Sequence, residues 1–268
     1  MFQVSHTFIV RLHFAFQSDY EYFFVLDFMA GGDFFAFLKR HRKLDENQVR
    51  FYAAEVLLAL EYMHSYEPPI AYRDLKPENI MIGIDGHIKL TDFGFAKFFG
   101  EEGDLFDSAG SPRRERSHSI VGSAFYIAPE IVNMAKSDGH DLSVDFWSFG
   151  CLIYEMVCGH ALFADPKSEA MFNQMKKSGQ ISKGSTFQQF TMYVHIPNFI
   201  FVFFSRQNPD ISCNPRTRHR LLHTQESAVF PASLSKPLLS LLNNLLQRNP
   251  DLRCKSWAQV KQHEFFKV

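Results

Sequence analysis

Cysteine is scarce in this sequence, and a long apolar run is missing. Only 4 of the 268 residues are cysteines, and no two have the Cys-x-x-Cys spacing of a metal or redox site. This scarcity excludes a disulfide scaffold and favours a reducing compartment, so we expect a cytoplasmic protein, with the nucleus as the alternative. The longest apolar run covers residues 199–204, and the first ten residues lack the features of a secretory signal. No transmembrane segment is therefore expected.

An excess of charge of either sign is also missing. The chain carries 28 basic and 29 acidic residues, which give a net charge of −1. Such a balance provides no general attraction to nucleic acid or to anionic lipid. Three arginines between residues 216 and 220 form a local basic patch, which we interpret as solvated surface. Nucleic acid is therefore not an expected partner.

Phenylalanine, in contrast, is abundant, with 30 residues, mostly at alternating or helical spacing that is typical of a core. Alternation predicts strands at residues 8–16 and 22–28, and a hairpin of residues 80–84 and 87–91 around Asp85-Gly86. Helical spacing predicts helices at residues 33–42, with Asp33 as the N-cap, and at 49–63, 144–157, 170–177, 237–247 and 256–265. Residues 101–119 are predicted to form a loop, and residues 181–225 show no sustained period. Strands first and helices later indicate an α+β fold with a helical bulk.

The most informative segment is residues 72–79, YRDLKPEN, which is too polar and irregular for a helix or a strand. Asp92-Phe93-Gly94 follows, and Ala128-Pro129-Glu130 comes later. Phosphoryl transfer to a hydroxyl needs an orienting carboxylate, positive charge against the phosphates, and oxygen ligands for Mg²⁺. This ordered set closely resembles the catalytic loop, the metal-binding loop and the substrate-loop anchor of eukaryotic protein kinases.

The resemblance implies a protein-kinase-like fold that uses ATP and Mg²⁺. Asp74 would orient the substrate hydroxyl, Lys76 would neutralise the transferred phosphoryl, and Asn79 and Asp92 would bind the metal. Lysine two residues after the catalytic aspartate is the family's mark of serine/threonine specificity. The ATP-binding residues that the resemblance implies lie at the hinge, at the adenine floor and at the metal: Leu26, Asp27, Met29, Met81, Asn79 and Asp92.

Other positions match the structural parts of the family. Glu130 would pair with Arg253, and Asp145 would hold the backbone of the catalytic loop. The remaining structural positions are the catalytic-loop and metal-loop neighbours Tyr72, Arg73, Phe93 and Gly94. Tyr72 and Phe93, together with Leu12, match an apolar stack that joins the two lobes.

Tyr72, where most kinases have histidine, narrows the resemblance. Together with residues 51–55 (FYAAE) and 91–97 (TDFGFAK), it points to the AGC group, which includes the cyclic-nucleotide-dependent and S6-type kinases. Asp33, Glu78 and Glu155 match three acidic positions that bind arginines upstream of the phosphorylated residue in basophilic members.

The same alignment implies a regulated substrate loop. Ser123 would lie at the substrate site, and Ser119, four residues earlier, would be the regulatory phosphosite of an activating upstream kinase. A phosphate on Ser119 would pair with Arg73 beside the catalytic aspartate. The alternative is that Ser117 and Ser119 are ordinary loop residues.

The resemblance covers roughly residues 4–180 and 226–267, and it departs from the family in two places. Aligned on residues 8–10, the sequence starts after the positions of the glycine-rich loop and the ATP-orienting lysine. We therefore expect one kinase domain over residues 1–268, with residues 1–28 as a remnant of the small lobe and 29–268 as the large lobe. The two remnant strands are expected to be poorly supported. Residues 181–225 would be an atypical insertion, real or the product of an imperfect gene model.

The expected function is transfer of the ATP γ-phosphate to serine or threonine in protein substrates with upstream arginines. Because the phosphate clamp is not among these residues, Mg-ATP binding no tighter than high micromolar and slow transfer are expected. Two alternatives stay open: a catalytically impaired pseudokinase that acts as a binding module, and a fragment of a longer kinase.

Overall fold

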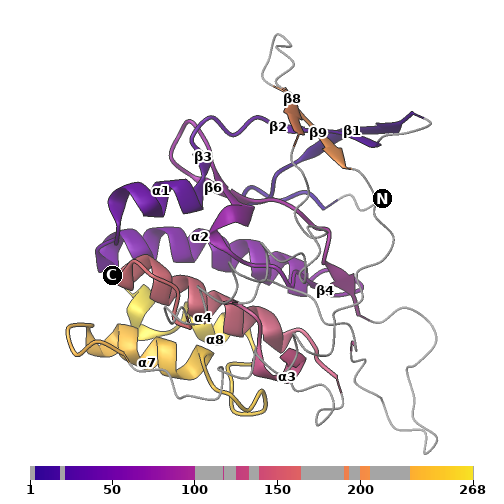
Figure 1. Ribbon diagram of the computed structural model, residues 1–268. Helices are drawn as coiled ribbons and strands as arrows, with labels where there is room; N and C mark the ends of the chain where they lie inside the picture. The colour runs from indigo at the N-terminus through magenta and orange to yellow at the C-terminus, as the bar shows by residue number, and fades with distance from the viewer. Residues whose placement is uncertain are drawn as a thin grey trace, which may run out of the picture.

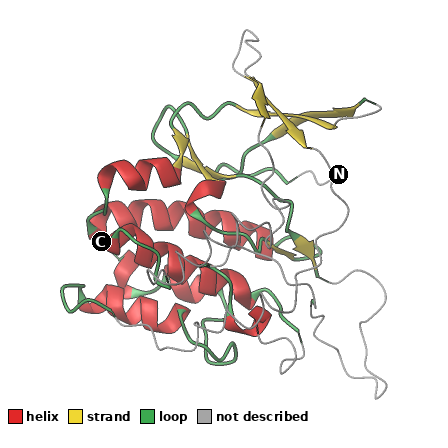
Figure 2. Ribbon diagram, viewed as in Figure 1, coloured by secondary structure: helices red, strands yellow, loops and turns green. Residues whose placement is uncertain are grey.

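The structure is a computed structural model. It describes residues 4–18, 22–99, 117, 125–132, 139–163, 190–192, 200–205 and 230–267, with the backbone alone for residues 132, 190–192 and 200–205. Strands gather at one end of the molecule and helices at the other (Figures 1 and 2). This α+β arrangement is the one that the sequence predicted.

The central helix of the helical part is α2 (Glu46–His64). Asp45 and Gln48 form a capping box, in which each side chain accepts a hydrogen bond from the backbone N–H of the other residue. One face of the helix is fully buried and includes Val49, Ala53, Leu60 and Met63. This face and its neighbours form the core, which α4 (Ser143–Cys158), α7 (Lys236–Leu245) and α8 (Trp257–Lys261) complete.

The other helical elements are short. Helix α1 (Phe34–His41) is capped by Asp33, whose carboxylate accepts a 2.7 Å hydrogen bond from Ala36 N–H. α3 (Pro129–Val132) follows the substrate loop, and two 3₁₀ turns, η1 (Pro77–Asn79) and η4 (Glu264–Phe266), lie beside α1 and α7. In α4, a Cβ at Gly150 would lie 2.9 Å from Leu246, so the absence of a side chain allows the close approach of α7.

A short hairpin forms the floor between the two ends of the molecule. Its strands are β5 (Ile80–Ile82) and β6 (Ile88–Leu90), and the predicted turn is made by Asp85 and by Gly86 at φ 83°. β3 (Gly32–Asp33) adds to β5, and β4 (Ile70–Ala71) pairs with β7 (Lys97–Phe98). The sequence did not predict these two-residue strands.

The upper sheet has the strand order β1-β2-β9-β8. β1 (Leu12–Gln17) and β2 (Tyr22–Asp27) are the predicted small-lobe strands. β8 (Phe190–Met192) and β9 (Ile200–Ser205) come from the segment in which no sustained period was found. All neighbours in this sheet are antiparallel. The segment 181–225 therefore contributes two strands to the upper sheet.

The chain before β1 is docked on the core, which corrects two expectations. The predicted strand at residues 8–16 begins only at Leu12, because residues 8–10 bind the floor hairpin instead. Val10 N–H donates to Leu90 O and Leu90 N–H to Phe8 O, both at 2.9 Å, and Ile9 is only 2% exposed. The expectation of poor support is thus wrong for residues 8–10, which the core binds, and for β1 and β2 it stays a prediction.

Some predicted features lie outside the described residues: the helix at 170–177 and most of the loop at 101–119, including Ser119. Ser123 is likewise outside them. Among the helices that the structure describes, none is both long and apolar enough to cross a membrane.

Candidate active site

The catalytic loop leaves β4 and carries its polar side chains into a buried cluster. The carboxylate of Asp74, a residue only 3% exposed, accepts hydrogen bonds from Lys76 Nζ at 2.7 Å and from Asn79 Nδ2 at 2.8 Å. Asn79 Nδ2 also donates to Asp74 O at 2.9 Å. The structure thus brings together the two predicted catalytic residues and one predicted metal ligand.

Asp92, the second predicted metal ligand, follows β6. Its backbone has φ 58°, a left-handed conformation that is uncommon for aspartate, and its Oδ1 accepts a hydrogen bond from Gly94 N–H at 3.1 Å. Burial raises the pKa of Asp92, and the charge of Asp74 raises it further. Strained backbone and opposed carboxylates are features of functional sites.

These residues fit a magnesium ion. Asn79 Nδ2 points at Asp74, which leaves its Oδ1 to bind a cation, and a divalent ion would relieve the repulsion between Asp92 and Asp74. Among the described residues, no group of three or more His, Cys, Asp or Glu side chains could hold a metal. Two oxygen ligands suit Mg²⁺, which is commonly bound through one or two carboxylates plus substrate phosphates.

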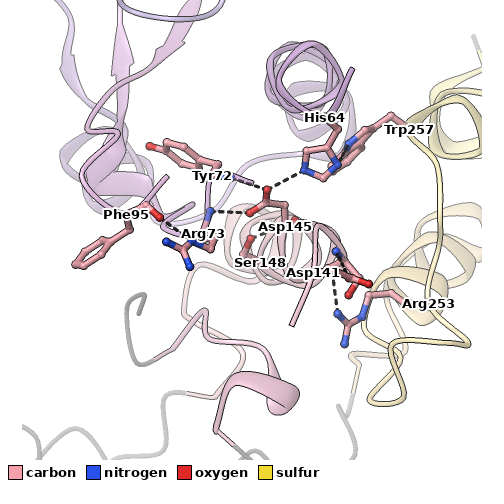
Figure 3. Close-up of polar contacts among 10 residues, drawn as sticks. His64, Tyr72, Arg73, Phe95, Asp141, Asp145, Ser148, Arg253 and Trp257 are labelled. Carbon is pink, nitrogen blue, oxygen red and sulfur yellow. Dashed lines mark hydrogen bonds and ion pairs between the residues drawn. The ribbon is translucent and has the colours of Figure 1, made fainter. Parts of the chain in front are cut away.

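A buried carboxylate on α4 fixes the catalytic loop. Asp145 accepts hydrogen bonds from the backbone N–H groups of Tyr72 and Arg73, both at 2.8 Å, as predicted (Figure 3). Its Oδ2 also lies 2.8 Å from His64 Nε2, and Trp257 Nε1 donates to His64 Nδ1 at 2.9 Å. Sequence reasoning missed His64 and Trp257. A histidine and a tryptophan at helix positions look like ordinary core, and no local signal distinguishes them.

Tyr72 also contacts the metal loop. Its ring meets that of Phe93 edge to face at a centroid distance of 5.5 Å, and its hydroxyl donates to Thr91 O. Two of the three members of the predicted stack of Leu12, Tyr72 and Phe93 are therefore in contact.

The predicted hinge lies at the end of β2. Asp27 N–H donates to Arg11 O, and the Asp27 carboxylate contacts Lys89 Nζ at 2.6 Å and His13 Nε2 at 2.8 Å. Burial alone would raise the pKa of Asp27, but these hydrogen bonds lower it. Met29 is buried, and Met81 lies opposite Lys89 in the floor hairpin. Both the carboxylate and the backbone N–H of Asp27 are thus engaged within the protein, and adenine binding at this hinge stays a prediction.

The arginine beside Asp74 reaches the substrate loop. Arg73 Nε donates to Phe95 O at 2.7 Å, and its Nη1 lies 3.0 Å from Ser117 Oγ and 3.4 Å from His140 Nε2. Burial and the nearby cations Arg73 and Lys97 lower the pKa of His140 to about 4. Among the described residues of this loop, Ser117 is thus a serine that lies against Arg73.

Two of the three acids predicted to bind substrate lie near each other. Burial raises the pKa of Glu155, and the charge of the exposed Glu78 raises it further. The Tyr126 hydroxyl donates to Glu155 Oε2. Asp33 caps α1, so its Oδ1 already accepts one hydrogen bond.

The predicted anchor of the substrate loop is buried and bidentate. Arg253, 2% exposed, donates to both carboxylate oxygens of Glu130 at 2.7 and 3.0 Å. It also donates to Ser143 O and Gln247 O, and its guanidinium lies over the Trp147 ring. This set links α3, α4 and the segment after α7.

The protein kinase domain family matches residues 1–266. The chain belongs to this family. It is 42% identical over 175 residues to a putative ribosomal protein S6 kinase alpha-1 of Caenorhabditis elegans and 44% over 160 to cAMP-dependent protein kinase type 3 of Saccharomyces cerevisiae. It is also 44% identical over 161 residues to human ribosomal protein S6 kinase alpha-2.

These matches cover 60–65% of the chain and 20–35% of the relatives, so the chain spans only a minor part of their length. The relatives are serine/threonine kinases of the AGC group, and the predicted group is confirmed.

Proposed function

We propose that this chain carries the phosphotransfer site of a serine/threonine protein kinase that uses Mg-ATP and acts on proteins with arginines upstream of the target. The observation that supports this best is the buried cluster of Asp74, Lys76 and Asn79 beside Asp92. No single hydrogen bond in it is unusual. The combination places an acceptor, a cation and two oxygen ligands within one loop pair, as phosphoryl transfer requires.

Each residue has a role that its contacts support. Asp74 accepts the hydrogen bond of the substrate hydroxyl and orients it, while Lys76, 2.7 Å away, places positive charge beside the transferred group. Bound Mg²⁺ would neutralise the phosphates and would be held by Asn79 Oδ1 and the Asp92 carboxylate. The hinge backbone at Asp27 and Met29 would bind adenine over Met81.

Recognition of arginine is supported by Glu155 and Glu78. Two carboxylates close enough to raise a pKa form a site that a guanidinium would stabilise. Asp33 would contribute less, because its carboxylate also caps a helix.

For regulation, we propose phosphorylation of Ser119 by an upstream kinase and pairing of the phosphate with Arg73. Support comes from Ser117, two residues away, whose hydroxyl lies 3.0 Å from Arg73 Nη1. The cytoplasm, with the nucleus as the alternative, is the proposed location. The free thiols of Cys151, Cys158 and Cys254 support a reducing compartment.

A peptide library with serine, threonine or tyrosine at a fixed centre tests this function. We expect phosphate on serine and threonine peptides with arginine two or three residues before the target, and none on tyrosine peptides. The Glu155→Gln variant should lose the arginine preference, while the Glu264→Gln variant, altered at an exposed residue, should keep it. Modification that ignores the upstream residue would overturn the basic-motif assignment.

A further inference from the structure

β9 lies directly against β2, the last small-lobe strand before the hinge. The two strands lie side by side in Figure 1. Six consecutive residues pair in antiparallel register, from Tyr22 with Ser205 to Asp27 with Ile200, without a bulge. All of β2 is therefore matched by β9.

β9 is also paired on its other side. Residues 202–204 of β9 face residues 23–25 of β2 on one edge and residues 190–192 of β8 on the other. At these positions β9 is a central strand of a four-stranded sheet, although some 175 residues of chain separate it from β2. Without β8 and β9 the sheet would be a two-stranded hairpin, which is marginally stable in water.

The sequences of the two strands favour strand pairing. β2 reads YFFVLD and β9 reads IFVFFS, both rich in β-branched and aromatic residues and free of glycine and proline. Asp27 is the one charged residue in the two strands, and runs of such low charge with an unpaired edge are templates for association with other chains. Pairing within one molecule removes the inner edge of each.

We propose that the β2 edge is a strand-binding surface and that residues 200–205 of the same chain are its occupant. The described strands of segment 181–225 are then a structural part of the upper sheet, to which they are added, and not a dispensable insertion. In their absence the β2 edge accepts an extended apolar strand from another source, a second copy of the chain included.

The test removes the segment and returns the strand as a peptide. In a deletion variant that joins residue 180 to residue 226, hydrogen exchange of the amides of residues 22–27 should be at least about tenfold faster, with the α2 amides unchanged. A peptide of residues 198–207 with added terminal lysines should restore protection. The same peptide N-methylated at alternate residues should not restore protection. It keeps the side chains but lacks the backbone N–H donors of the methylated residues. Equal protection with and without the segment, or equal rescue by both peptides, overturns the proposal.

If the deletion variant does not fold, as loss of α2 protection would show, point variants of the whole chain decide the matter. Val202→Pro removes a backbone donor from the centre of β9, whereas Val202→Ala keeps it. Faster exchange at residues 22–27 in the proline variant alone supports strand addition. No difference between the two variants contradicts it.

Discussion

The carboxylate of Asp145 lies 2.8 Å from Nε2 of His64, although 81 residues separate them in the sequence. Asp145 is fully buried, and the same carboxylate holds the backbone N–H groups of Tyr72 and Arg73 (Figure 3). One side chain of α4 thus connects the end of α2 to the start of the catalytic loop. The position of Asp74, two residues after Tyr72, depends on this connection.

Replacing Asp145 by asparagine should destabilise the fold and misplace the catalytic loop. The amide keeps one acceptor and puts an N–H₂ group where the carboxylate accepted, so a buried donor is left unsatisfied. We expect a loss of about 3 kcal/mol in the free energy of unfolding, measured by urea denaturation. Asp251→Asn, at a side chain that is 70% exposed, is the control and should change it by less than about 0.5 kcal/mol. A loss in Asp145→Asn no larger than in the control would contradict the role of this tether.

Arg253→Lys should be costly even though it keeps the positive charge. Lysine has a single side-chain nitrogen and cannot make the paired hydrogen bonds to Glu130. It also cannot donate to Ser143 O and Gln247 O at the same time. The expected loss in the free energy of unfolding is about 2–4 kcal/mol. Lys255→Ala, which removes only an exposed pair with Asp251, serves as the comparison and should be close to neutral. Similar stability of both variants would show that the charge alone suffices.

Asp92→Asn should stabilise the protein while it removes activity. Because burial raises the pKa of Asp92, its charged form opposes folding above that pKa, and a neutral amide avoids the cost. We expect a gain of about 0.5–2 kcal/mol in the free energy of unfolding at pH 7, a typical gain when a functional strain is removed. The gain should fade as the pH falls through the raised folded-state pKa of Asp92 and should be absent below the ordinary aspartate value of 3.8, where both states are protonated. A less stable variant at pH 7 would contradict this explanation.

The pair of His87 and Glu55 should make stability depend on pH. The hydrogen bond and charge of Glu55 raise the pKa of His87 above 6.5. A raised histidine pKa contributes stability that is fully present below 6.5 and is lost as the pH rises through the folded-state value. His87→Gln should therefore lower Tm at pH 5.5 more than at pH 9, as scanning calorimetry would show. An equal shift at both pH values would mean that ring contacts with Phe8 and Phe51, and not charge, account for the effect.

Local patterns and the family resemblance together predicted most of the framework. The capping residue Asp33 and the turn at Gly86 act through near neighbours, so helix α1 and the floor hairpin could be predicted from sequence. Helical spacing predicted most of α2, but not its capping residue Asp45. The roles of Asp145 and of the pair of Glu130 and Arg253 came from motif position, and the structure confirms their contacts.

What the sequence did not predict depends on partners far along the chain. β3, β4 and β7 have two residues each and exist only because another strand lies beside them. The sequence of β9 shows no alternation of apolar and polar residues, because its first five residues are all apolar. The period that predicts a strand is therefore missing. Ile9 was predicted to be part of a strand. Instead, its neighbours Phe8 and Val10 form hydrogen bonds with the N–H and the carbonyl of Leu90. His64 gave no sign that its two ring nitrogens face Asp145 and Trp257.

The central claim is that Asp74 and Asp92 carry phosphoryl transfer, and its most direct test is a rate. The purified chain is incubated with millimolar ATP and an arginine-containing serine peptide, with and without Mg²⁺, and phosphopeptide is measured over hours. We predict Mg²⁺-dependent transfer that falls by at least about a hundredfold in Asp74→Asn and in Asp92→Asn and is unchanged in Asp251→Asn. No transfer by the unmodified chain, or transfer that survives in both active-site variants, would contradict the account.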